Sequence, residues 1–521
     1  MIRIGALLLL LLVAPAHAQP VAVTVAGGFD PHLVTNIYAT ALAFMAPRTL
    51  EPVAVSQLTI WGLRGLTALD PDLNAELRDG KLRLAAKDRI LATRPPPPDT
   101  DVNGWAAAAA ELATVAVAAS MPVRRASTQG VVQSFFDELF NHLDPYSRYV
   151  APRDAGEDRE RRSGQAGAGL RLTRRGSAIV VTEAIWDGPG ALAGIRPGDV
   201  IVSVDGQSTR GKDAPAVADW INGPEETQVS VAWRSRDGRL HTADLERAMV
   251  PPETVVSQRV GDMLVIQVSS FSRSTDSHLA RAIEQGIAGT RPPQGIVLDL
   301  RGNRGGLLRQ AVTAADALLR AGVVAITAGR DPEATRVWRS TSGDLAEDFP
   351  VVVMVDGRTA SAAEILAAAL ADRGRGVVIG SSTLGKGLVQ TISPLPDGGE
   401  LFVTWSRVLA PRGWPIQGLG VLPQVCTSLG QDTLSWQLGS LADGQQPMAQ
   451  AIATHRAARA PIPPAQILAI RNACPAAEGR DTDLDTARQL IHDPAAYAAA
   501  LLPPMRDSGQ MSVVSGQSAT R

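Results

Sequence analysis

Ser361 and Lys386 are the two residues whose types and surroundings best suit covalent catalysis. Ser361 follows the β-branched run 351–355, which predicts a buried strand, and lies at the start of the alanine-rich stretch 360–371, which predicts a helix. Lys386 stands between two glycines after a second β-branched run, 376–380. A hydroxyl at a helix start and an amine on a glycine turn can act as nucleophile and general base when the fold brings them together. We therefore expect these two side chains to form a catalytic pair.

Both residues also fit ordinary structural roles. Ser361-Ala-Ala-Glu364 has the pattern of a capping box, and a lysine between glycines is most often a solvated turn residue. Lysine is rare in this chain, however, because only four of its 50 basic residues are lysine and the other 46 are arginine. An amine can lose its proton when it is buried, whereas a guanidinium cannot. The use of lysine at position 386 therefore favours a catalytic role.

The positions of the histidines disfavour a histidine base. None of the seven lies near Ser361 or Lys386 in the sequence, and His278, early in a predicted helix, is the one to consider. Lysine acts as a base only when it is neutral near pH 7, and burial can lower its pKa by about 3–5 units. Leu384, Leu388 and Val389 would supply an apolar setting. Gln390, on the same face of the strand expected after Lys386, could accept a hydrogen bond from the amine and orient it.

Composition sets the broad class of the protein. At 521 residues the chain is expected to form three or four domains. Its net charge of −2 does not indicate binding to nucleic acid or to a membrane surface. Residues 1–18 have the pattern of a signal peptide cleaved after Ala18, which predicts export, most simply to the periplasm, and no stable membrane span is expected. Cys426 and Cys474 are the only cysteines and could pair in an oxidising compartment. Neither a metal site nor a cofactor is expected.

Periodicity divides the chain into regions. Apolar spacing predicts a helical region over 19–150, with helices near 36–45, 55–66, 105–119 and 129–143. Strands alternating with helices predict an α/β core over 258–426, in which 401–408, 414–416 and 418–421 are expected to be short strands. Residues 427–507 are expected to be helical and 508–521 disordered. The fold class is therefore multidomain α+β.

Residues 160–250 have a different pattern, with short strands separated by glycines and prolines. The run from Gly188 to Gly206, which contains Arg196-Pro-Gly-Asp199, resembles the central pattern of a PDZ domain. Gly167, Ala168, Gly169 and Leu170 resemble the loop with which PDZ domains bind a chain-terminal carboxylate. The alternative, a turn of an unrelated β-domain, is disfavoured by the length of the match.

Several motifs of the chain occur in one characteristic order. They are Leu143-Asp-Pro-Tyr-Ser147, the PDZ segment, Asp299-Leu-Arg-Gly-Asn-Arg-Gly-Gly306, Thr359-Ala-Ser-Ala-Ala-Glu-Ile365, Gly385-Lys-Gly-Leu-Val-Gln390 and Ile416-Gln-Gly418. Over roughly 125–425 this order resembles the carboxyl-terminal processing peptidases, also called tail-specific proteases.

The resemblance implies an α/β core of the crotonase/ClpP-like type and a serine endopeptidase that uses its PDZ domain to find free C-termini. It assigns Ser361 as nucleophile, Lys386 as general base and Gln390 as its supporting residue. It also assigns the backbone amides of Ala362 and Gly305 to an oxyanion hole. The implied partners are protein or peptide substrates bound through their C-termini, with an adaptor protein as a further candidate. The oligomeric state is left open.

Two other interpretations compete with a protease. Gly380-Ser-Ser-Thr-Leu-Gly385-Lys386 satisfies the GxxxxGK pattern of a P-loop, but Gly387 replaces the Mg²⁺-binding Ser/Thr and the following residues predict a strand. The second alternative is a catalytically inactive PDZ scaffold or adaptor. The presence of every expected catalytic group disfavours that alternative.

Overall fold

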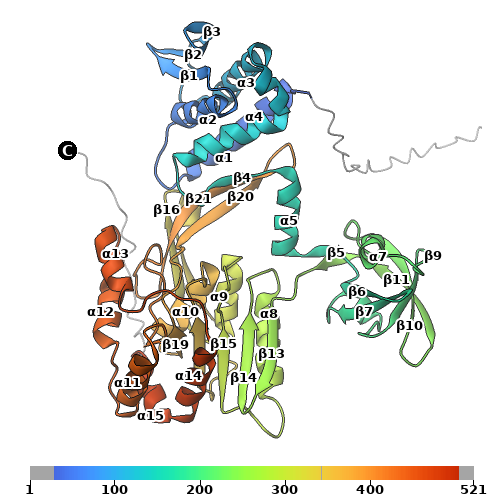
Figure 1. The fold of residues 1–521 in the computed structure, drawn as a ribbon, viewed down its shortest axis with the longest axis vertical. Coiled ribbons are helices and arrows are strands. Elements are labelled where there is room, and N and C mark those ends of the chain that lie inside the picture. The colour runs from blue at the N-terminus through green and yellow to red at the C-terminus, as the bar shows by residue number, and fades with distance from the viewer. Residues whose placement is uncertain (1–27, 342, 504–521) are drawn as a thin grey trace, which may run out of the picture.

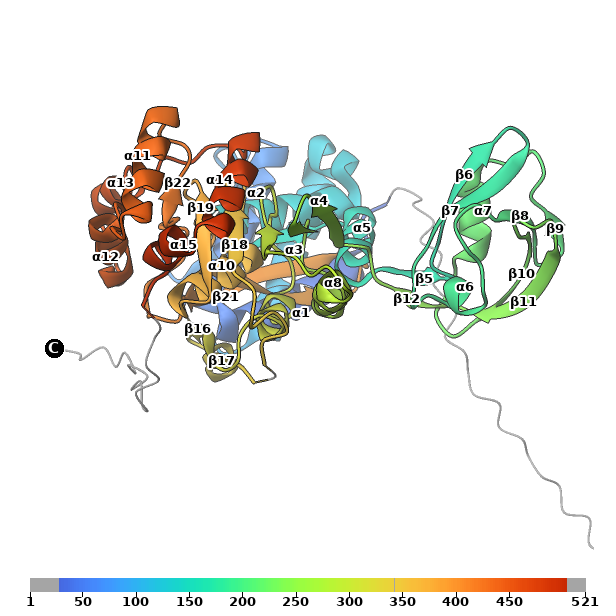
Figure 2. The same cartoon turned by 90° about the horizontal axis from the view of Figure 1, so that it is seen from below.

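The computed structural model describes residues 28–341 and 343–503, so the predicted signal peptide (1–18) and disordered tail (508–521) lie outside the described residues. A helical region occupies one end of the molecule and a mixed α/β core the other (Figure 1). A small β-domain projects to one side, as the second view also shows (Figure 2). The predicted multidomain α+β architecture is confirmed.

The N-terminal region is built on four helices around their own apolar core. Trp105 and Tyr38 are almost completely buried there, and Tyr38 stacks on Phe135 with ring centroids 4.0 Å apart. One described helix, α3, is long and apolar enough to cross a membrane by length and composition, but its Trp105 and Leu112 face this core. The helices are α1 Pro31–Arg48, α2 Val55–Leu69, α3 Val102–Ala119 and α4 Met121–Asn141.

The helical region also contains strands that were not predicted from the sequence. A three-stranded antiparallel sheet, β1 Leu73–Arg78, β2 Lys81–Ala86 and β3 Arg89–Arg94, is inserted between α2 and α3. The first two strands join through Asp79-Gly80, both at positive φ, which is the two-residue turn that favours a hairpin. Leu82 and Leu84 alternate inward with period two, and this alternation was the signal for a strand.

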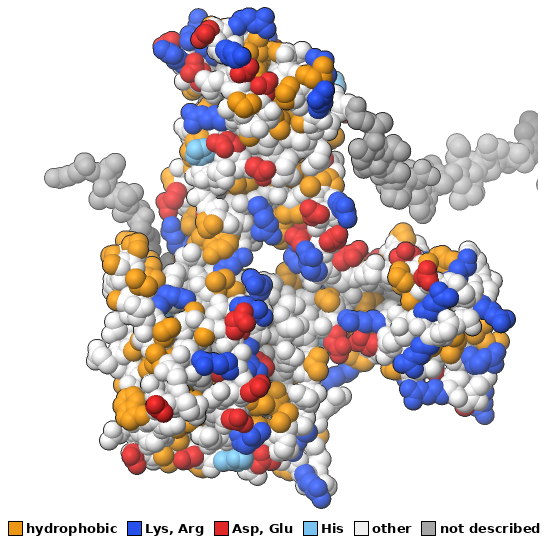
Figure 3. Space-filling view, in the orientation of Figure 1, with side chains coloured by type: hydrophobic (Ala, Val, Ile, Leu, Met, Phe, Trp, Pro, Cys, Tyr) orange, Lys and Arg blue, Asp and Glu red, His pale blue; other side chains and the backbone are white. Residues whose placement is uncertain are grey.

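The β-domain is connected to the rest of the chain at two points. Helix α5, Pro152–Ser163, leads into it, and Figure 3 shows acidic and basic side chains mixed over this link. A two-stranded ladder of β5 Gln165–Gly167 and β12 Ala248–Val250 closes its base. Its main sheet runs β11-β10-β8-β7-β6, so β6 is an edge strand, and α7 packs against it. The elements are β6 Leu170–Arg175, β7 Ala178–Ala184, α6 Pro189–Leu192, β8 Val200–Val204, β9 Gln207–Ser208, α7 Ala214–Ile221, β10 Gln228–Arg234 and β11 Leu240–Glu246.

The core is organised around a six-stranded sheet in the order β13-β14-β15-β18-β19-β22, parallel except for the β13–β14 pair. The strands are β13 Val255–Val260, β14 Met263–Val268, β15 Gly295–Asp299, β18 Val351–Val355, β19 Gly376–Gly380 and β22 Val425–Cys426. Strands β15, β18 and β19 are completely buried because helices cover both faces. One face packs against α8 Thr275–Ile287, α9 Leu308–Asp316 and α10 Ala362–Asp372.

A second sheet connects the core to the helical region. Its order is β17-β16-β21-β20, and β4 of the helical region also pairs with β21. The strands are β4 Arg148–Val150, β16 Gly322–Gly329, β17 Arg336–Ser340, β20 Leu388–Pro394 and β21 Glu400–Leu409. The strands predicted at 414–416 and 418–421 do not form. Pro415 makes only an isolated bridge to Leu409, and the Gly418 N–H bonds to the Gly385 carbonyl instead.

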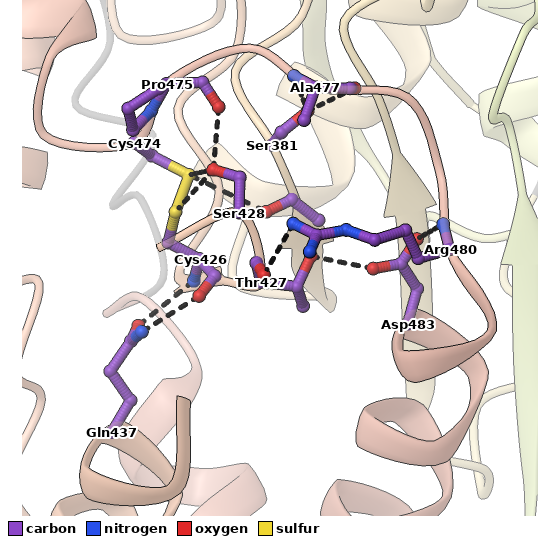
Figure 4. Close-up of a disulfide and its surroundings, with 11 residues drawn as sticks. Ser381, Cys426, Thr427, Ser428, Gln437, Cys474, Pro475, Ala477, Arg480 and Asp483 are labelled. Atoms are coloured by element: carbon purple, nitrogen blue, oxygen red, sulfur yellow. Dashed lines mark hydrogen bonds between the residues drawn. A yellow bond between two sulfur atoms is a disulfide. The ribbon is translucent and has the colours of Figure 1, made fainter. Parts of the chain in front are cut away.

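Three C-terminal helices cover the other face of the parallel sheet: α11 Gln431–Ala442, α14 Asp481–His492 and α15 Pro494–Ala500. The other two, α12 Ala449–Ala457 and α13 Pro464–Arg471, pack elsewhere: Ile452 of α12 joins the first face's core, and Ile470 of α13 packs with Leu419. Cys426, the last residue of β22, is bonded to Cys474, just beyond α13, with Cα atoms 5.7 Å apart (Figure 4). Ser428 lies against this disulfide and donates to the Pro475 carbonyl at 2.6 Å. The possible pairing of the two cysteines is thus realised, and it fixes the C-terminal region to the end of the sheet.

Candidate active site

Ser361 lies at the C-terminal edge of the parallel sheet, in the turn between β18 and α10. Its backbone has φ 56° and ψ −118°, a region that non-glycine residues rarely occupy. Such strained residues concentrate where a side chain must be presented in a fixed direction, as at the strand-to-helix turn that exposes a nucleophile. The side chain is half-buried.

The turn that carries Ser361 is fastened to the glycine-rich turn after β15. The Asp356 carboxylate accepts hydrogen bonds from the N–H groups of Gly302 at 3.0 Å and Thr359 at 2.9 Å. The Ala360 N–H donates to the Asn303 carbonyl at 2.9 Å. Because β15 and β18 are neighbouring parallel strands, their following loops meet at one edge, and these bonds fix their separation.

Glu364 joins the turns of the predicted nucleophile and the predicted base. Its Oε2 accepts the N–H groups of Ser361 at 2.7 Å and Lys386 at 2.9 Å, while Oε1 accepts the Gly385 N–H at 2.7 Å and the Thr383 hydroxyl. The side chain is completely buried, and this burial raises the pKa of Glu364 whereas its four donors lower it. Glu364 therefore does more than cap the start of α10, because its carboxylate anchors both the Ser361 turn and the Lys386 turn.

Lys386 is half-buried on the turn before β20. Burial is the main cause that lowers the pKa of its amine, the nearby Arg148 lowers it further, and Asp144 and Glu364 oppose the shift. The amine lies 4.8 Å from the centroid of the Tyr146 ring. A strand, not a helix, follows Lys386, and this contradicts a P-loop.

Gln390 lies on β20 beside this turn. Its side-chain nitrogen donates to the Leu388 carbonyl at 3.1 Å and to the Thr404 hydroxyl at 3.0 Å. Within the described residues no hydrogen bond joins Lys386 to Gln390 or to the Ser361 hydroxyl. The support of the amine by Gln390 therefore stays a prediction.

The two residues predicted to form an oxyanion hole adjoin Ser361. A Cβ built on Gly305 would lie 2.8 Å from the Ser361 Cβ and 3.0 Å from the Ala362 nitrogen, so only glycine allows this approach. The Gly305 N–H donates to the Asn303 side chain at 2.8 Å and is engaged in this conformation. The N–H of the next residue, Gly306, has no hydrogen-bond partner among the described residues.

One cavity of about 870 Å³ brings these groups together: Ser361, Lys386, Gln390 and Gly305 all line it. Its apolar wall includes Phe271, Leu308, Ile365, Leu388 and Val408, and its rim carries Arg148, Arg162 and Arg304. No histidine of the described chain lines it, and His278 faces a separate cavity of about 350 Å³ beside the β-domain. Within the described residues no group of three or more His, Cys, Asp or Glu is arranged to hold a metal ion.

The predicted carboxylate-binding loop lies at the start of the edge strand of the β-domain. Gly167 ends β5, Gly169 has φ +71°, and Leu170 begins β6. The carbonyls of Ala168 and Gly169 accept from Gly190 at 2.8 Å and Ile185 at 2.9 Å, which fixes the loop against the segment around α6. An edge strand with a helix beside it leaves a groove into which an extended peptide can add.

Residue-by-residue reasoning missed the part of the site that comes from the helical region. Asp144, Tyr146 and Ser147 reach the surroundings of Lys386 and Gln390, as does Thr404 on β21. The motif Leu143–Ser147 carried a signal, since it was part of the family resemblance. No local pattern marked Thr404.

The fold and site define a peptidase core joined to a PDZ domain, and comparisons with known proteins agree. The model of peptidase family S41 matches residues 262–427, and a PDZ domain model matches residues 180–235. The chain belongs to peptidase family S41.

Two curated relatives and one solved structure illustrate the similarity. A carboxy-terminal-processing protease of Bartonella bacilliformis is 34% identical over 302 residues, which is 57% of this chain and 69% of the relative. A probable CtpA-like serine protease of Staphylococcus saprophyticus is 33% identical over 54% of this chain and 57% of its own length. The solved photosystem II D1 C-terminal processing protease has 30% identity and a TM-score of 0.33, covering 59% of this chain and 86% of that one.

Proposed function

We propose that this protein is an exported serine endopeptidase that binds free protein C-termini through its PDZ domain and cleaves near them by Ser/Lys catalysis. The observation that carries the proposal is the shared anchoring of the two turns. Glu364 accepts the backbone N–H groups of both Ser361 and Lys386, and both side chains line one cavity.

In the proposed reaction the neutral amine of Lys386 takes the proton of the Ser361 hydroxyl as the oxygen attacks a peptide carbonyl. The ammonium then gives that proton to the leaving amine, and an ester between Ser361 and the substrate remains. Water, deprotonated by the same amine, hydrolyses the ester. The lowered pKa of Lys386 supports this role, because an ordinary lysine is almost fully charged near pH 7.

Negative charge on the attacked carbonyl oxygen needs fixed donors. The Ala362 N–H, at the start of α10, is one candidate, and its helix end adds favourable partial charge. A small rotation of the Asn303–Gly306 turn would offer a second N–H from Gly305 or Gly306. Such tightening on substrate binding is common in catalytic sites.

The PDZ domain suits capture of a protein tail. An extended C-terminal segment would add to β6 as an extra strand, with its carboxylate at Gly167–Leu170. The disulfide Cys426–Cys474 supports the predicted export, because such bonds persist in oxidising compartments.

The test measures cleavage and tail binding separately. Purified protein is incubated with a model protein that has an apolar C-terminus, and the products are mapped by mass. Ser361→Ala and Lys386→Arg should abolish cleavage but keep binding of the tail peptide. A scaffold or adaptor would bind without cleaving even as wild type, and cleavage that survives both substitutions would refute the Ser/Lys assignment.

A further inference from the structure

The turn that follows α4 extends from the helical region into the surroundings of the predicted base. Asp144 Oδ1 accepts the N–H groups of Tyr146 at 3.0 Å and Ser147 at 3.1 Å, and Oδ2 accepts the Ser147 hydroxyl at 2.5 Å. The carboxylate therefore holds its own turn rigid. Asp144 and Tyr146 are half-buried, and the Tyr146 ring packs against the amine of Lys386, which lines the catalytic cavity.

Two side-chain bonds connect this turn to β21. The Thr404 hydroxyl donates to Asp144 Oδ1 at 2.7 Å, and the Thr404 N–H donates to the Ser147 hydroxyl at 2.9 Å. The neighbouring residues Arg148–Val150 pair with β21 as β4. The turn thus has a fixed position relative to the second sheet, on which Gln390 lies.

Thr404 determines which end of the Gln390 amide is held by β20 and β21 and which end is left free. An ionised carboxylate can only accept, so Thr404 must use its single hydroxyl proton toward Asp144. The Thr404 oxygen can then only accept from Gln390, and the Leu388 carbonyl, the other partner, also only accepts. Both partners therefore require the NH₂ group of Gln390, and its amide oxygen is left for an amine donor.

The same turn also contacts the base directly. The Lys386 amine lies 4.8 Å from the centre of the Tyr146 ring, within the range of cation–π attraction. The turn that carries Asp144 therefore also places an aromatic ring against the Lys386 amine.

We propose that Asp144 and Thr404 are positioning residues of the general base: they orient the Gln390 amide oxygen toward the Lys386 amine, and so make catalysis depend on the docked helical region. This inference rests on the proposed Ser/Lys function. Gln390 and Thr404 lie inside the matched peptidase segment 262–427, whereas Asp144 lies outside it, in the N-terminal region.

The test is a double-mutant cycle measured on the full chain with a fluorogenic peptide substrate. Thr404→Val keeps the size of the side chain but removes the hydroxyl, and kcat should fall about tenfold or more while KM changes less than twofold. Thr404→Ser restores the hydroxyl and should restore kcat. In a Gln390→Met background, Thr404→Val should have no further effect on kcat, because the residue acts through Gln390.

Thr391→Val is the matched control, since Thr391 lies on β20 beside Gln390 and has no side-chain hydrogen bond among the described residues. Thr404→Ala gives the same cycle if Thr404→Val does not fold. Full activity of Thr404→Val, or equal losses with and without Gln390, would overturn the proposal. If Ser361→Ala also keeps activity, the proposed function fails; if Ser361→Ala is inactive, only the positioning role fails.

Discussion

Replacing Glu364 by glutamine tests the carboxylate that anchors the turns of Ser361 and Lys386. The change keeps the shape of the side chain but turns one acceptor oxygen into an NH₂ group. If the amide oxygen stays with Gly385 and Thr383, the NH₂ group faces the N–H groups of Ser361 and Lys386, and two buried donors lose their acceptor.

The expected loss of stability follows from the number of N–H groups that are left without an acceptor. Each buried N–H without a partner costs about 1–3 kcal/mol, so Glu364→Gln should lower the free energy of unfolding by about 2–6 kcal/mol. Because both turns lose their common anchor, kcat should fall by about tenfold or more even at temperatures where the variant is folded.

Two assays measure these effects. Urea unfolding followed by circular dichroism gives the stability, and cleavage of a fluorogenic peptide gives kcat. Glu284→Gln, at an exposed position on α8 of the same core, is the control and should change neither quantity. A Glu364→Gln variant with the stability and kcat of wild type would refute the anchoring role.

Three further predictions concern the base and the disulfide. In a pH-rate profile, kcat/KM should rise with pH as Lys386 loses its proton. Arg148→Gln should move that rise to higher pH, because the positive charge of Arg148 lowers the pKa of Lys386. Tyr146→Leu removes a ring that favours the charged amine and should move the rise about half a pH unit lower, whereas Tyr146→Phe should leave it in place. Replacing both Cys426 and Cys474 by alanine should lower the free energy of unfolding in urea by about 4 kcal/mol, since the bond closes a loop with a sequence separation of 48. A profile unmoved by Arg148→Gln or Tyr146→Leu, or unchanged stability without the disulfide, would contradict the corresponding prediction.

The fold could be predicted from the sequence where a run of residues has one clear hydrophobic pattern. The runs 351–355 and 376–380 form buried parallel strands as expected, because apolar β-branched residues without alternation suit a sheet covered on both faces. The β1–β3 sheet was missed because its strands contain arginine, lysine and alanine in place of a continuous β-branched run, and only the Asp79-Gly80 turn and two alternating leucines marked it.

The site was predictable to the extent that its residues lie in local motifs. Ser361, Lys386 and Gln390 are all marked by glycine turns or element starts, and they do line one cavity. The hydrogen bond between Thr404 and Asp144 joins positions 260 residues apart. The hydrogen bond from the Gly305 N–H to the Asn303 side chain depends on a single side-chain conformation. Neither kind of contact leaves a periodic signal in a sequence.

The proposed mechanism requires Lys386 to provide a neutral amine next to Ser361. The chain has only four lysines, so NMR of protein labelled with ¹³C at the lysine ε-carbons gives few signals, and Lys386→Arg identifies the signal of Lys386. We expect this amine to titrate clearly below the ordinary lysine pKa of about 10.4, and Ser361 to be modified by a serine-directed acylating probe only above that titration. Titration of all four lysines at the ordinary value would contradict the proposed mechanism.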